Sequence, residues 1–147
     1  MGDTMKPVVI AGLALVAVLF LVMPALACDI PDEPLTQGYW KNHPGEWASE
    51  EKFSNFFKSG DSYLGVLKTP TRGNAYYILA HQHIAAYLNG AAWTEIGSIR
   101  EVWWEAKSLF CTYGPDEIAR MKGNDPVRRQ FVSLAETLDA FNNGHYS

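Results

Sequence analysis

An uncharged apolar stretch near the N-terminus constrains this chain more than any other feature. Residues 8–27 are twenty positions without a charged side chain, preceded by Lys6 and closed by Ala25-Leu26-Ala27. A short basic lead, an apolar core and a small-x-small triplet are typical of an export signal. Twenty apolar residues are also enough to span a bilayer as an uncleaved anchor. We expect residues 1–27 to be a signal peptide or membrane anchor, with cleavage favoured over retention.

The two cysteines allow two interpretations that exclude each other. Cys28 follows the triplet directly, where lipoprotein processing would attach a lipid, although Ala25 stands where such a signal usually has leucine. Cys28 and Cys111 are also the chain's only cysteines, and an even pair in an exported protein is most simply a disulfide. In the chain-entropy model this cross-link would stabilise the fold by roughly 4 kcal/mol.

The rest of the chain is long enough for one domain with its own core. Residues 28–35 contain two prolines among acids and are expected to form an extended tether, so the domain comprises residues 36–147. Residues 1–27 hold one acid and one base, so the net charge of residues 28–147 remains −4. This charge argues against nucleic acid as a partner. We expect membrane contact only through the N-terminal segment or a lipid on Cys28.

The apolar spacing is helical almost throughout, with no convincing strand alternation. The fold class predicted is all-α, an irregular bundle of four to five helices after the N-terminal signal or anchor helix. Stop and cap residues predict a first helix from Thr36 to Pro44, a second from Ser49 to Lys58 with three buried phenylalanines, and a possible turn at 61–67. Further helices are expected at 74–89, 94–112, 116–122 and from Asp125-Pro126 to Phe141.

Three motifs of this chain carry a family resemblance. Residues 36–44, Thr-Gln-Gly-Tyr-Trp-Lys-Asn-His-Pro, are followed by Trp47; residues 79–89 read Leu-Ala-His-Gln-His-Ile-Ala-Ala-Tyr-Leu-Asn; and residues 138–144 end in Asn-Asn-Gly. Together they resemble the opening motif, central helix and closing turn of a family of exported bacterial and archaeal proteins. The resemblance implies a secreted or surface domain of the same build and brings no established activity. His83 stands where that family would have an aliphatic residue.

The candidate binding residues come from these motifs and from one tryptophan outside the core stripe of its helix. A structural clasp is expected between the opening loop and the central helix, with His81 and Gln82 satisfying backbone groups of the loop. Trp104 shares a helix face with Cys111, and we expect it to pack on the disulfide and tether rather than to lie open. The binding residues considered are Trp40, Lys41, Asn42, His43, Trp47, His81, Gln82 and Trp104.

No catalytic residue, cofactor or metal ligand is assigned. The chain lacks Gly-x-Ser-x-Gly, a phosphate loop, His-Glu-x-x-His and Cys-x-x-Cys-His. His81 and His83 point to different sides of a helix, which leaves only His43 with His81 and Glu46 as a conceivable metal site.

Three functions therefore stay open, and all place the chain outside the cell or at its surface. The first is a structural or interaction module with an unknown extracellular or cell-surface partner. The second is a carbohydrate- or small-ligand-binding module built on its tryptophans, and the third is a metal-dependent hydrolase centred on His43 and His81. Co-planar exposed tryptophans in a groove would favour the second, and converging histidines and carboxylates in a cleft would favour the third.

We expect the exported protein to begin at Cys28 and to hold one disulfide. Its intact mass, measured before and after reduction and thiol alkylation, should then show two thiols only after reduction. A mass raised by acyl chains, with one thiol that reacts without reduction, would instead establish a lipid on Cys28.

Overall fold

The computed structural model describes residues 33–47 and 50–146, and these residues are helical, with no strand among them. They form six α-helices, more than the four or five expected: α1 (Gln37–Asn42), α2 (Tyr63–Lys68), α3 (Ala75–Leu88), α4 (Gly97–Thr112), α5 (Pro115–Arg120) and α6 (Pro126–Asn142). Two short 3-10 helices, η1 (Pro44–Glu46) and η2 (Glu50–Phe53), follow α1. The expected signal or anchor helix and Cys28 lie outside the described residues.

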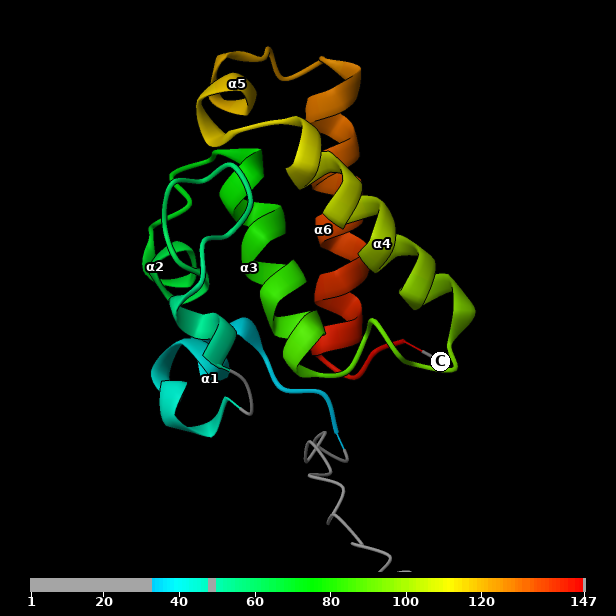
Figure 1. Cartoon of the computed structure of the whole chain (residues 1–147). Coiled ribbons are helices and arrows are strands. Elements are labelled where there is room, and N and C mark those ends of the chain that lie inside the picture. Colours follow the sequence, from blue (N-terminus) through cyan, green and yellow to red (C-terminus); the bar gives the residue numbers. More distant parts are fainter. Residues whose placement is uncertain (1–32, 48–49, 147) are drawn as a thin grey trace, which may run out of the picture.

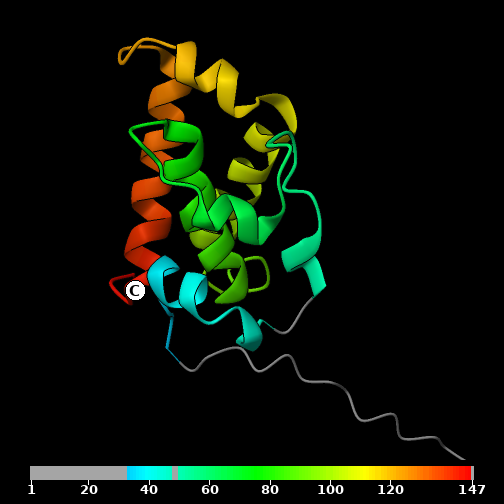
Figure 2. The ribbon, with the colours of Figure 1, turned by 90° about the vertical axis from the view of Figure 1, so that its left-hand side faces the viewer.

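Helix α3 is the centre of the bundle (Figures 1 and 2). It packs against α6 along its length and also contacts α1, α2, α4 and α5. Its side chains are buried on nearly every side, as expected for a helix that is apolar all round. Asn74 caps its N-terminus by accepting a hydrogen bond from the Tyr76 backbone N–H, so the prediction of a helix at 74–89 is confirmed.

Helices α4 and α6 flank α3 with amphipathic faces. Helix α6 begins as predicted, with Asp125 accepting from the Val127 and Arg128 backbone N–H groups and Pro126 at the first helical position. Helix α4 begins at Gly97, three residues later than expected, with Ile96 as its N-cap. The inner faces of both helices join α3 in one core; they consist of Ile99, Trp103, Ala106, Phe110, Phe131, Leu134, Leu138 and Phe141.

The predicted helix from Ser49 to Lys58 is wrong. Ser49 lies outside the described residues, and the helix that follows is only the 3-10 turn η2. Phe57 has a positive φ of 44°, which a regular right-handed helix cannot accommodate. An antiparallel bridge between Asn55 and Ser62 then closes a loop, and Ser62 caps α2.

This loop serves to insert one aromatic ring into the core. Phe56 is fully buried and makes edge contacts with Phe110 and Tyr63, with ring centroids 4.8 and 4.9 Å apart. Phe57 is half-buried, whereas Phe53, which was expected to be buried, is 69% exposed. A tertiary contact therefore overrides the local helical pattern here.

One end of the bundle gathers four segments that are far apart in the sequence. Residues 33–36, α1, the C-terminal end of α3 and the C-terminal end of α6 all lie there (Figure 1). The connection from α3 to α4 starts at the same end, with Gly90 at a positive φ of 83° after the helix. We call this the clasp end, because the contacts described next hold its segments together.

Candidate functional site

A buried amide at the clasp end binds the opening segment to the core. The Asn89 Oδ1 atom accepts hydrogen bonds from the Leu35 backbone N–H at 2.9 Å and from Trp40 Nε1 at 3.1 Å. The Asn89 Nδ2 atom donates to the Leu35 carbonyl at 2.7 Å and to Asn142 Oδ1 at 2.9 Å. Because one side chain satisfies four groups on three segments, it fixes the opening segment against both α3 and α6.

Asn142 extends this network along the α3–α6 interface. It is fully buried, and its Nδ2 atom donates to both the backbone carbonyl and the side-chain oxygen of Gln82, at 3.0 and 2.9 Å. Gln82 Nε2 in turn donates to Asp139 Oδ1 at 2.8 Å, where the network reaches the surface. A polar seam therefore runs from Trp40 to Asp139, with its buried members paired.

The side chains of the opening motif mainly contact other residues of the same motif. Trp40 and Trp47 are buried, and the Trp47 indole N–H donates to the Trp40 carbonyl at 3.0 Å. Asn42 donates to the Gly38 carbonyl, and the exposed His43 ring stacks on Tyr39 with centroids 4.1 Å apart. Lys41 is exposed.

The opening segment is joined to the core, but not through His81 and Gln82, to which we had assigned the clasp. His81 contacts the Val66 carbonyl on α2 through Nε2 at 2.9 Å, and burial lowers its pKa. Gln82 bonds to α6 instead of the opening loop. The residues that join the loop to the core are Asn89 and Asn142, which sequence reasoning read only as helix-ending positions. Asn89 lies inside the second motif and Asn142 inside the third.

A row of aromatic rings crosses from the clasp end to α4. Tyr87 and Trp93 have centroids 5.4 Å apart, Tyr87 and Trp103 are 5.9 Å apart, and Trp103 and Trp104 are 4.9 Å apart. Trp103 is buried, whereas Trp93 and Trp104 at the two ends are 62% and 48% exposed. We call these four residues the aromatic row. The row therefore exposes an indole at each end, and the rings between the two ends pack against both indoles.

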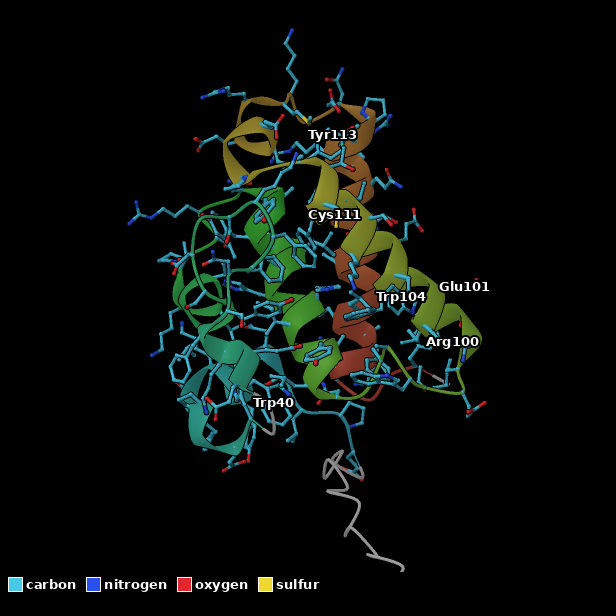
Figure 3. The ribbon with its side chains drawn as sticks, in the orientation of Figure 1. Trp40, Arg100, Glu101, Trp104, Cys111 and Tyr113 are labelled. Atoms are coloured by element: carbon cyan, nitrogen blue, oxygen red, sulfur yellow. The ribbon has the colours of Figure 1, made fainter. Side chains whose placement is uncertain are left out.

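The outer end of this row carries a cation. The Lys107 Nζ atom lies 4.6 Å from the centroid of Trp104 and 5.8 Å from that of Trp103. Such contacts are favourable and orient the ring. Trp104 is exposed, whereas we expected it to pack on the disulfide and the tether. Cys28 lies outside the described residues, and Cys111 is an exposed free cysteine among them. Figure 3 shows Trp104 and Cys111 on α4, and Trp40 on α1.

His83 lies under the row and is fully buried. Its ring stacks on Trp103 with centroids 4.6 Å apart, and it faces Phe56 and Phe110. Desolvation, with a smaller contribution from the charge of Lys107, lowers the pKa of His83 from 6.5 to about 3. The imidazole is therefore a neutral member of the aromatic core at neutral pH.

The residues considered for metal binding are not brought together. Within residues 33–47 and 50–146, no group of three or more His, Cys, Asp or Glu side chains could hold a metal ion, so His43, His81 and Glu46 form no such site. The same part of the chain contains no helix that is long and apolar enough to cross a membrane. No protein-family model, curated protein or solved structure matches this chain.

Replacing Asn89 with leucine should destabilise the protein strongly. The change leaves Leu35, the Trp40 indole N–H and Asn142 without their partners in a buried site, which should cost about 3 kcal/mol or more. Asn42→Ala, which removes one exposed hydrogen bond, should cost less than about 1 kcal/mol. Urea unfolding at pH 7 measures both changes, and equal losses would contradict a central role for Asn89.

The burial of His83 should make the fold sensitive to mild acid. The folded-state pKa lies below the unfolded value of 6.5, so the unfolded state binds a proton first and stability falls as the pH drops from 6.5 towards 3. At pH 5 the loss due to this group should be about 2 kcal/mol. The variant His83→Leu should lose less stability than the wild type between pH 7.5 and pH 5 in urea unfolding. An unchanged difference between the two pH values would assign the acid sensitivity to other groups.

Proposed function

We propose that this protein is exported and acts at or outside the cell surface as a small interaction domain. The apolar segment at 8–27, the following Ala-x-Ala triplet and the cysteine after it support export. The acidic balance of the rest of the chain makes nucleic acid an unsuitable partner. The all-α fold with its polar seam provides a rigid support for a binding surface.

The outer face of α4 is the surface that we assign to partner binding. The exposed Trp104 ring, with Lys107 beside it, is the observation that carries this assignment. Tryptophan is enriched among the residues that dominate protein–protein affinity. Trp103 packs edge-on against the Trp104 ring from below, so the ring does not need to be ordered on binding. Glu101, Ser108 and Cys111 on the same helix are exposed around it (Figure 3).

A carbohydrate or another flat ligand is the second candidate, favoured by the same exposed indole. Extended sugars stack on rings that share one plane, whereas successive rings of the aromatic row are inclined by 49°, 23° and 87°. The row therefore forms no single flat platform. This geometry supports a protein partner, with contact to one sugar ring at Trp104 as the alternative outcome.

Trp104→Ala should weaken binding of the purified exported protein to washed cell envelopes of the producing organism by about 30-fold. This factor corresponds to the loss of roughly 2 kcal/mol that is typical of a central tryptophan. Phe53→Ala is the matched control, because Phe53 is more exposed and also has a lysine over its ring, with Lys52 Nζ 5.4 Å from the centroid. Co-sedimentation over a range of protein concentrations measures the affinities.

Treatment of the envelopes identifies the class of partner. Binding that is lost after protease digestion and kept after glycan hydrolysis would support a protein partner. The opposite pattern would support the carbohydrate candidate. Equal binding by the Trp104 and Phe53 variants, or no binding by the wild type, would contradict the assignment of this face.

A further inference from the structure

The position of Leu35 limits how far the domain can stand from a membrane. A retained apolar segment or a lipid on Cys28 would each place the membrane at residue 27 or 28. Leu35 is fixed at the clasp end by its two hydrogen bonds to Asn89. Seven residues extend at most about 25 Å, so an anchored chain must keep the clasp end within that distance of the lipid.

The alternative disulfide needs a much more demanding path. Cys111 follows Phe110, whose ring packs on Tyr76 with centroids 5.1 Å apart. Tyr76 lies thirteen residues before Asn89 along α3, which corresponds to about 20 Å. To bring Cys28 to Cys111, the same seven residues would have to run along the bundle and around its side chains. An anchor at residue 27 or 28 requires no such path, and on this ground we take it in preference to the cleaved, disulfide-closed chain that the sequence alone favoured.

The clasp end also carries a side chain that suits a membrane interface. Trp93 follows Asn89 by four residues, in a turn closed by a hydrogen bond from its backbone N–H to the Gly90 carbonyl at 3.0 Å. One side of its ring packs on Tyr87, and the rest is exposed. Tryptophan is enriched at the level of lipid headgroups because its ring is apolar and its N–H is polar.

We propose that the chain is anchored at residue 27 or 28 and that the clasp end faces the membrane, with Trp93 inserted among the lipid headgroups. This inference takes only export from the proposed function. It gives the bundle a fixed orientation, in which the aromatic row starts at the membrane with Trp93 and leads away from it to Trp104. The partner-binding face of α4 is then presented at a set height above the lipid.

Charge should contribute little to this contact. Among the described residues of the clasp end, Lys41 on α1 is a cation, and Arg100 at the start of α4 donates to the Thr94 carbonyl at 3.1 Å. Glu33 and Glu95 are acids of the same segments, and Glu46 in η1 accepts a hydrogen bond from Tyr39. Because cations do not outnumber acids there, insertion of Trp93 into neutral phosphatidylcholine should not require anionic lipid.

The test uses the full chain as the cell exports it, extracted from its membrane and reconstituted into phosphatidylcholine vesicles. Half of the samples contain phosphatidylcholine brominated near the headgroup, which quenches nearby tryptophans. We expect clear quenching of the wild type, and a loss of at least half of it in Trp93→Ala. The matched variant Trp104→Ala, which also removes one exposed indole, should keep the wild-type quenching. Circular dichroism checks that both variants stay folded.

Three results would overturn the inference. One is release of the exported protein without acyl chain or apolar segment, as shown by its intact mass. Another is equal quenching in the Trp93 and Trp104 variants, and the third is no quenching in an anchored wild type. Envelope binding through Trp104 is measured separately, so failure of the orientation and failure of the proposed function can be distinguished. The same mass tells a lipid on Cys28 from a retained segment.

Discussion

The hydrogen bonds of the Asn89 side chain determine how the first described residues meet the rest of the fold. Leu35 and Trp40 have no helical partners for the groups that Asn89 satisfies, and Asn142 brings α6 to the same point. A buried amide with all its groups paired specifies one arrangement, because any shift of the opening segment leaves several polar groups unpaired at once. The position of residues 33–36, the fold of α1 and the orientation of α6 are therefore set together.

The aromatic core adds adaptable contacts to this rigid seam. Phe56, His83 and Phe110 meet mostly edge to face, an arrangement that fills space between α3, α4 and the loop before α2. Buried polar groups normally need partners, yet His83 Nδ1 has none among the described residues. The same burial lowers the pKa of His83, since a charged imidazole there would be surrounded by aromatic rings. Stability is thus sensitive to acid at a buried position that stacks on Trp103, the ring beneath Trp104.

Local signals predicted much of the helical architecture, whereas tertiary contacts decided the remainder. Asn74, Asp125 and Pro126 act on their own helix ends, so their positions could be read from the sequence. The segment from 50 to 62 has a helical pattern, but burial of Phe56 and the positive φ of Phe57 give it a different course. The roles of His81 and Gln82 were misassigned for a similar reason, because a polar residue on a buried helix shows that it needs a partner but not which one.

The candidate surfaces were the least predictable feature, because exposure depends on the whole packing. Trp103 and Trp104 are neighbours in the sequence, yet one is buried and the other is open to solvent. Helix geometry turns successive residues by about 100°, so only one of two neighbours can face α3. The other must face outward, and Lys107, one turn later, lies over its ring. The exposed indole that we propose as the partner contact therefore follows from helix geometry together with the burial of Trp103.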